Sequence, residues 1–81
     1  MAGEERRKRD ALTKTASAVT RVRDAERDLE VAVARAVHWG ATWAEVAAAL
    51  GVTPQAAHKR FRRVRYDPTS GRAWQEPPLP L

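Results

Sequence analysis

A stretch in the middle of the chain decides the fold: residues 42–65 read TWAEVAAALGVTPQAAHKRFRRVR. It begins with the pattern of a capping box, in which the Thr42 hydroxyl accepts a hydrogen bond from the backbone N–H of Glu45 and the Glu45 carboxylate accepts one from that of Thr42. A short helix comes next, and we expect it to end at Gly51, because glycine adopts a left-handed conformation with little strain. The first half of the stretch therefore predicts a helix with both ends specified.

The second half of the stretch predicts a second helix. Thr53 is a good N-cap residue, and Pro54 fits the first turn, where its missing N–H leaves no hydrogen bond unmade. Two short helices joined by a three-residue turn that contains glycine are typical of a helix-turn-helix. Apolar residues recur on one face of each helix, and we expect them to form the core: Trp43, Val46, Ala47 and Leu50 in the first helix, and Ala57, Phe61 and Val64 in the second.

The run from Gly40 to Arg63 resembles the helix-turn-helix of bacterial regulators. It is similar to the region-4-like modules of sigma factors and to small helix-turn-helix proteins of actinobacteria. The other regions of a sigma factor are missing, so a complete sigma factor is not implied. The resemblance implies that the second helix enters the major groove of DNA, where its early residues contact base edges: Thr53, Gln55, Ala56, His58 and Lys59.

Basic residues are concentrated at the end of the same stretch. The chain carries a formal net charge of +5, and five Lys and Arg residues with no acidic residue fall within residues 59–65. Such a cluster favours a polyanionic partner, although it also fits a solvated helix face. Gln55 suits adenine and Lys59 suits guanine, whereas for His58 a plain surface position fits as well as a base contact. We expect contacts with DNA phosphates from Thr42, Arg60, Arg62, Arg63 and Arg65.

Residues 4–39 are expected to form one long helix, because they contain no proline or glycine and many good helix formers. The second half of this helix is expected to cover the helix-turn-helix core. The first half extends beyond the core, and an isolated helix is only marginally stable in water. We therefore expect a homodimer whose interface includes Leu12, Val19 and Val22. These residues belong to a trace with steps of three and four: Leu12, Thr15, Val19, Val22, Glu26, Leu29, Val33 and Ala36.

The predicted fold class is all-α, with a long N-terminal helix, a helix-turn-helix and an extended tail. Residues 1–10 are expected to form a frayed basic arm, and residues 11–65 the DNA-binding domain. Residues 66–81 are rich in proline and turn-forming residues, which predicts an extended tail. In this tail Trp74 either folds back onto the domain, belongs to a disordered segment or anchors a recognition segment for another protein.

Composition excludes several classes of function. The chain has no cysteine and two distant histidines, so we expect no disulfide, no metal site and no cofactor. No nucleophile–base pair or phosphate-binding loop is recognisable, so we expect no enzyme. No aromatic motif of an RNA-binding domain is present either. The chain has no apolar stretch of membrane-spanning length and no signal peptide, which favours a cytoplasmic protein located at the nucleoid.

The sequence therefore predicts a protein that reads double-stranded DNA, acting as a dimeric transcriptional regulator that inserts helix 54–65 into the major groove. Two alternatives stay open. The chain is a protein–protein interaction module for a polymerase, a toxin or another regulator, with the tail as one contact surface. Or it coats DNA without sequence preference, since phosphate contacts dominate both kinds of binding.

Overall fold

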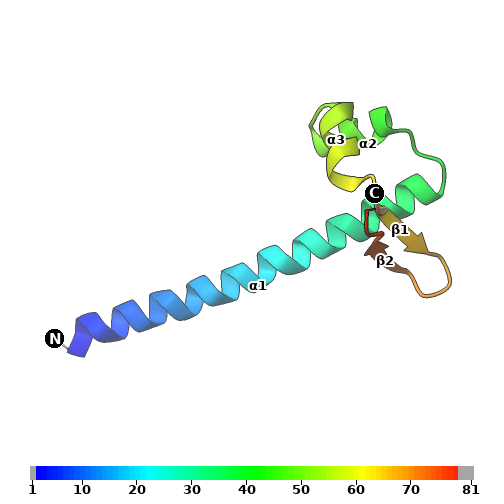
Figure 1. The fold of residues 1–81 in the computed structure, drawn as a ribbon. Coiled ribbons are helices and arrows are strands. Elements are labelled where there is room, and N and C mark those ends of the chain that lie inside the picture. The colour runs from blue at the N-terminus through cyan, green and yellow to red at the C-terminus, as the bar shows by residue number, and fades with distance from the viewer. Residues whose placement is uncertain (1, 79–81) are drawn as a thin grey trace.

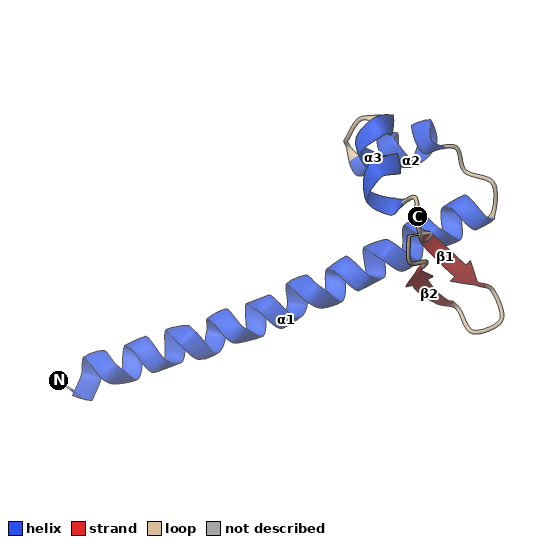
Figure 2. Ribbon diagram, viewed as in Figure 1, coloured by secondary structure: helices blue, strands red, loops and turns tan. Residues whose placement is uncertain are grey.

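The computed structural model describes residues 2–78, and in this part of the chain three helices are followed by a two-stranded sheet (Figure 1). The helices are α1 (Ala2–His38), α2 (Trp43–Leu50) and α3 (Pro54–Phe61). The strands are β1 (Val64–Asp67) and β2 (Arg72–Gln75). Helices α2 and α3 lie on one side of the C-terminal end of α1, with the hairpin beside that end, and the rest of α1 runs away from them (Figure 2).

Helix α1 is longer than any other element and confirms the predicted long N-terminal helix. It begins at Ala2, so residues 2–10 of the expected frayed arm over residues 1–10 belong to the same helix, and residue 1 lies outside the described part of the chain. The helix ends in hydrogen bonds that close its last turn: the backbone N–H of Gly40 donates to the carbonyl of Val37 at 3.0 Å, and that of Ala41 donates to the carbonyl of Ala36 at 2.9 Å.

The predicted caps of α2 and α3 are present. The Thr42 hydroxyl accepts from the backbone N–H of Glu45 at 3.1 Å, and the Glu45 carboxylate accepts from that of Thr42 at 3.0 Å. Gly51 closes α2 with a φ of 74°, and its N–H donates to the carbonyl of Ala47 at 2.9 Å. The Thr53 hydroxyl caps α3 by accepting from the N–H of Ala56 at 3.1 Å. These contacts fix where the two helices begin and where α2 ends.

The all-α prediction is wrong at the C-terminal end, where residues 64–75 form an antiparallel hairpin. Helix α3 ends at Phe61 instead of continuing to residue 65, because Val64 pairs with Gln75 and Arg65 pairs with Trp74 across the sheet. The predicted extended tail over residues 66–75 is therefore replaced by a strand, a tight loop and a second strand. Residues 76–78 have no regular structure, and residues 79–81 of the predicted tail lie outside the described part of the chain.

The loop of the hairpin is built from turn chemistry. The Asp67 carboxylate accepts from the backbone N–H of Thr69 at 2.9 Å and from the hydroxyl of Ser70 at 2.7 Å. Gly71 adopts a left-handed conformation with a φ of 72°, and its N–H donates to the carbonyl of Asp67 at 2.8 Å. A carboxylate at the first position and a glycine at the last are common in short hairpin loops.

A small apolar core joins the C-terminal half of α1 to the helix-turn-helix and to β1. Helix–helix and helix–strand packing buries seven residues in one cluster, all of them apolar: Val33, Ala34, Val46, Ala47, Ala57, Phe61 and Val64. Leu29, Val37, Trp43, Leu50 and Tyr66 pack around this cluster in partly buried positions. The N-terminal half of α1 contributes nothing to the core. No helix within residues 2–78 has an apolar stretch long enough to cross a membrane.

Candidate nucleic-acid interface

The core fixes the orientation of α3. Ala57 is 1% exposed and Phe61 is 5% exposed, and both side chains face α1 and α2. Ala47, which is 2% exposed, lies in α2 within the same cluster, and its small side chain lets the two helices approach closely. Because the buried positions of α3 are set four residues apart, the opposite side of the helix is turned to solvent.

The solvent side of α3 carries polar and basic residues at helical spacing. Gln55, Lys59 and Arg62 follow one another at steps of four and three, and all three are exposed. We call these three residues the recognition face. Helix α3 contains no acidic residue, so no carboxylate of this helix opposes a negatively charged ligand. The recognition face therefore combines an amide that donates and accepts hydrogen bonds with two cationic groups.

The other three residues predicted to contact bases lie outside the recognition face. The imidazole of His58 packs edge-on against the indole of Trp43, with ring centroids 5.3 Å apart. Ala56 lies on the other side of α3, where it lines a small depression together with Leu50 and Val52. Thr53 is exposed, but its hydroxyl caps α3. The contact with Trp43 restrains the His58 ring, a restraint that the sequence did not suggest.

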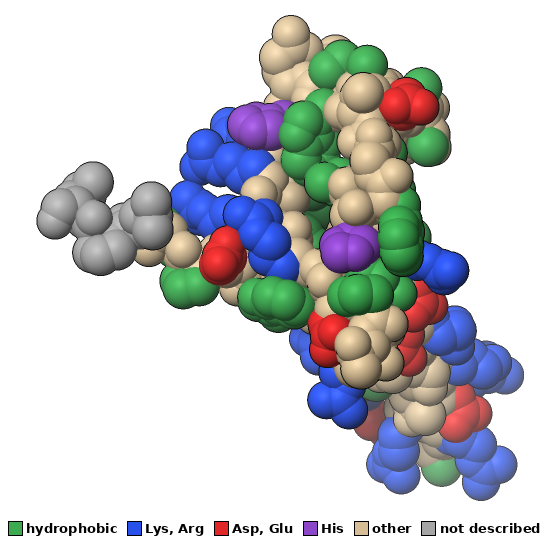
Figure 3. Space-filling model, turned by 90° about the vertical axis from the view of Figure 1, so that its right-hand side faces the viewer, with side chains coloured by type: hydrophobic (Ala, Val, Ile, Leu, Met, Phe, Trp, Pro, Cys, Tyr) green, Lys and Arg blue, Asp and Glu red, His purple; other side chains and the backbone are tan. Residues whose placement is uncertain are grey.

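A basic groove continues from the recognition face toward the C-terminal segment. Residues from the end of α3, from β1 and from the segment after β2 line it: His58, Arg62, Arg63, Arg65, Glu76, Pro77 and Pro78. Lys and Arg side chains gather on this flank of the molecule, next to a histidine (Figure 3). Arg62 is exposed and Arg63 is partly exposed, and both residues line the groove beside the C-terminal end of α3.

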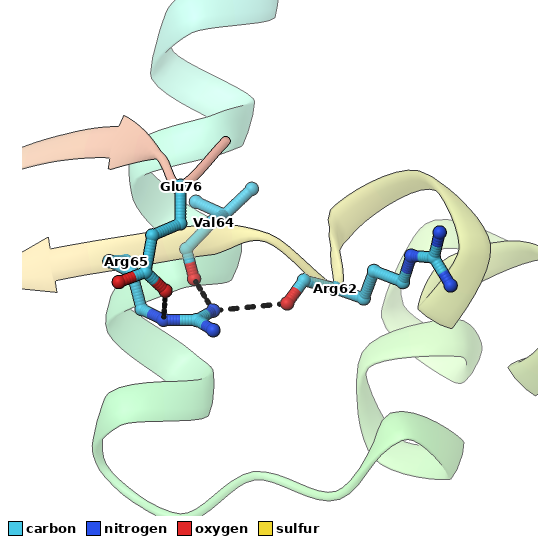
Figure 4. Close-up of polar contacts among 4 residues, drawn as sticks. All are labelled: Arg62, Val64, Arg65 and Glu76. Atoms are coloured by element: carbon cyan, nitrogen blue, oxygen red, sulfur yellow. Dashed lines mark hydrogen bonds and ion pairs between the residues drawn. The ribbon is translucent and has the colours of Figure 1, made fainter. Parts of the chain in front are cut away.

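Arg65 lines the groove but is held by internal contacts (Figure 4). Its Nε donates to the carboxylate of Glu76 at 2.9 Å. Its Nη1 donates to the carbonyl oxygens of Arg62 at 3.0 Å and Val64 at 3.1 Å. The backbone N–H of Glu76 also donates to the carbonyl of Arg63 at 2.8 Å. Arg65 therefore fastens the segment after β2 to the end of α3, and most of its donors are occupied.

Two further residues expected at phosphates are also engaged within the chain. The Thr42 hydroxyl accepts from the N–H of Glu45 and donates to the Glu45 carboxylate at 3.0 Å, so it has no free proton to donate. The guanidinium of Arg60 lies over the ring of Phe61, 4.8 Å from its centre. It also lines the depression beside Leu29, on a different side of α3 from the recognition face.

Two carboxylates of the domain have shifted acidities, and both shifts have a local cause. Hydrogen bonds from the backbone N–H and the hydroxyl of Thr42 lower the pKa of Glu45 below its ordinary value. The hydroxyl of Ser70 and the backbone N–H of Thr69 lower the pKa of Asp67 in the same way. Both groups belong to structural turns and caps, and neither lies on the recognition face.

The residues expected at a dimer interface are far from this groove. Leu12, Val19 and Val22 lie on the N-terminal half of α1 and are 61%, 42% and 56% exposed. The predicted site therefore separates into two parts, one on α3 and the other along α1. Sequence reasoning missed the part that Glu76, Pro77 and Pro78 play in the groove, because their position depends on the hairpin. The loop residues Asp67 and Gly71 were the signal for that hairpin.

Comparisons of the chain with protein-family models, with curated proteins and with solved structures found no match.

Proposed function

We propose that this protein binds double-stranded DNA by placing α3 in the major groove, and that it acts as a transcriptional regulator. The recognition face carries this proposal. An α-helix fits the major groove of B-DNA, and side chains on its outer face reach the base edges there. Gln55 and Lys59 of α3 and Arg62 at its C-terminal cap are exposed, while Ala57 and Phe61 hold the inner face of the helix in the core.

The three residues of the recognition face have different roles in this arrangement. Gln55 lies in the first turn of α3, and its amide matches the N6 and N7 atoms of adenine. Lys59 lies one turn later, where its ammonium group donates to O6 or N7 of guanine. Arg62 and its neighbour Arg63 lie at the end of the helix and contact phosphates on the groove edge. Arg65 and Thr42 take no part, because most of their hydrogen-bonding groups are engaged within the chain. Arg60 takes no part, because it lies over the ring of Phe61 on a different side of α3.

The segment after β2 borders this surface and limits its extent. Glu76 is the acidic residue among those that line the basic groove, and its charge is compensated by Arg65 at 2.9 Å. The ion pair keeps the carboxylate beside Arg65 and so reduces its repulsion of a phosphate bound by Arg62 and Arg63. The groove therefore receives a backbone phosphate at the edge of the recognition face.

The first experiment is selection from a pool of random duplex DNA at about 150 mM salt, with sequencing of the retained molecules. We expect a short enriched motif. Gln55→Ala should relax the preference at one base position and weaken binding to the selected site by about 1–3 kcal/mol. Arg62→Ala combined with Arg63→Ala should weaken binding to all sequences. It should also lower the slope of the logarithm of the binding constant against the logarithm of salt concentration by the amount expected for about two phosphate contacts.

A matched control separates the recognition face from net charge. The variant Lys59→Ala with Arg62→Ala loses one lysine and one arginine from α3 and its C-terminal cap. The control Lys14→Ala with Arg21→Ala loses the same two residue types from exposed positions of α1. We expect the first variant to lose binding and the second to keep it. Equal binding by the two variants would refute the proposal, and retention without any motif would replace it by a DNA-coating function.

A further inference from the structure

The N-terminal half of α1 is a helix without a partner. Apart from Ala18, which is partly buried, every residue from 2 to 28 is exposed. We call residues 2–28 the projecting half, and it extends about 40 Å along the helix axis. It leads away from α2, α3 and the hairpin (Figure 1). Large apolar side chains on it remain in water, among them Leu12 at 61% and Val22 at 56% exposure.

These side chains lie along one face of α1, which we call the seam. Further along the helix the same face packs against the rest of the domain. Positions 12, 15, 19, 22 and 26 continue, with the same alternating steps of three and four, into Leu29, Val33 and Ala36. Leu29, Val33 and Ala36 lie against α2, where they line a depression together with Val46 and Leu50. One face of α1 is therefore covered by its own chain at one end and bare at the other.

We propose that a second copy of this chain covers the bare end, with the two projecting halves packed side by side and antiparallel. In this pairing Leu12 of each copy lies opposite Val22 of the other, and Thr15 lies opposite Val19. The seam then forms four consecutive layers of apolar residues and threonine, as in a short coiled coil. The pairing uses no residue of α3, so it holds whether or not the chain binds DNA.

Charged residues in the seam select the antiparallel orientation. Lys8 and Glu26 occupy seam positions at the two ends of the apolar layers, and both are exposed. In a symmetric parallel pair, Lys8 meets Lys8 and Glu26 meets Glu26, which places like charges together. In the antiparallel pair, Lys8 of each copy lies opposite Glu26 of the other, which places opposite charges at both ends. Charge complementarity of this kind sets the orientation of coiled coils.

Small residues beside the seam support a close approach. Ala11, Ala18 and Ala25 follow one another at intervals of seven residues along one edge of the seam. In the antiparallel register Ala18 lies beside Ala18 of the other copy, and Ala11 lies beside Ala25. One pairing on the other edge is unfavourable, because Arg9 approaches Arg23. Both arginines are exposed and their long side chains turn into water, so this pairing reduces the affinity without preventing association.

The position of α2 and α3 also favours the antiparallel pair. They cover α1 from Leu29 onward, so a parallel partner would have to leave the seam just beyond Glu26. In the antiparallel register residues 8–26 of each copy lie opposite residues 26–8 of the other, so the paired layers stop short of Leu29 in both copies. In this register the partner covers the exposed seam positions that lie before Leu29. It places the two helix-turn-helix units at opposite ends of the pair, about 48 Å apart along the helix axes.

Sedimentation equilibrium of the full chain, from low micromolar to submillimolar concentration, tests the association. We expect a monomer–dimer equilibrium that Val19→Asp shifts to monomer. The three tryptophans all lie in residues 39–74, so their fluorescence shows whether the helix-turn-helix and hairpin stay folded in that variant. A chain that stays monomeric over the whole range would overturn the proposal, and so would a dimer unaffected by Val19→Asp.

A charge exchange tests the orientation. Lys8→Glu alone places like charges at both ends of the antiparallel pair, so we expect association to weaken by about tenfold or more. Adding Glu26→Lys restores the opposite charges and should restore the affinity. In a parallel pair residue 8 faces residue 8 and residue 26 faces residue 26. Each of these two contacts therefore joins like charges in the unchanged chain, in the single variant and in the double variant, so neither substitution should change the affinity in this way. Failure of the second substitution to rescue the first would therefore refute the antiparallel register.

A distance measurement gives an independent answer. The chain has no cysteine, so Arg7→Cys on the outer side of α1 supplies a single site for a spin label. In the antiparallel pair the two labels are separated by about 30 Å along the helix axes. In a parallel pair the axial offset is zero and only the spacing of about 10 Å between helices separates the backbones. A short distance between the labels would overturn the proposed orientation.

Discussion

The two halves of α1 follow the same sequence pattern but have different surroundings. Val33 and Val19 occupy equivalent positions of the seam, two heptads apart. Val33 is 5% exposed because α2 and α3 cover it, whereas Val19 is 42% exposed. A heptad trace therefore indicates that a helix face is suited to a partner, and it does not say whether the partner lies in the same chain. The halves differ because α2 and α3 pack against the C-terminal half alone.

The two halves also differ in what stabilises them. The half from Leu29 onward is held by the apolar core. Within the projecting half, the described ion pairs are local ones, between Glu5 and Lys8 at 3.2 Å and between Asp24 and Arg27 at 3.6 Å. Exposed pairs of this spacing contribute only about 0.2–0.5 kcal/mol each. The projecting half is therefore expected to unfold more readily than the rest of the helix whenever the chain is monomeric.

The largest expected effect comes from removing the cover of the C-terminal half. Phe61→Ala leaves a cavity between α3 and α1 and should lower the free energy of unfolding by about 3–5 kcal/mol. Urea denaturation monitored by tryptophan fluorescence measures the change. The variant should make both halves of α1 behave alike, with helicity reduced along its whole length. A stability close to that of the unchanged chain would show that the packing around Phe61 is misassigned.

A matched pair of substitutions sharpens the comparison directly. Val33→Ala removes buried methyl groups and should cost about 2 kcal/mol of stability. Val19→Ala removes the same groups from an exposed position, and in the dilute monomer it should change stability by less than about 0.5 kcal/mol. Both values come from urea titrations at low protein concentration. Similar values for the two variants would mean that the projecting half is packed within the monomer.

A smaller effect is expected at the cap of α2. Thr42→Ala removes the acceptor for the N–H of Glu45 and should cost about 1 kcal/mol. The loss should appear in the tryptophan signal of the domain. The helicity of the projecting half, probed in a chain labelled near residue 10, should stay unchanged. A parallel loss at both places would show that the two halves unfold as one unit.

The smallest effect is a dependence on pH. The hydrogen bonds from Thr42 lower the pKa of Glu45 in the folded chain below its ordinary value of 4.5. The ionised carboxylate therefore adds stability above that pH, and this contribution is lost as pH falls through the lowered pKa. Glu45→Gln keeps a hydrogen-bond acceptor without the charge, so the stability of this variant should fall less between about pH 5 and pH 3. The pKa of Asp67 is also lowered, and this residue is present in both chains, so it contributes the same pH dependence to each.

Local signals in the sequence predicted the helix-turn-helix well. The hydroxyl caps at Thr42 and Thr53 and the left-handed Gly51 are interactions between neighbours in the chain, so they are visible without the fold. The recognition face follows from the position of Ala57 and Phe61, which the apolar spacing predicted. The base and phosphate contacts themselves stay predictions.

The end of α3 and the hairpin could not be located in the same way. Val64 lies three residues after Phe61, which suits the apolar face of a helix, and it is buried as predicted but in a strand. Pairing with Gln75 outweighs the helical preference of the arginines before it. The sequence did not reveal the internal contacts of Arg65 either, because its partner Glu76 is brought close only by the hairpin. Contacts between residues distant in sequence decide this part of the fold.

The continuity of α1 has a mechanical consequence. No proline or glycine interrupts the helix between Glu4 and His38, so its two halves move as one rod on short timescales. A tilt of about 10° at the helix-turn-helix displaces the far end by about 7 Å over a lever of about 40 Å. Any ligand that fixes the direction of α3 thus also aims the distant end of α1. The rod acts as a ruler as well, since each inserted heptad would lengthen it by about 10 Å.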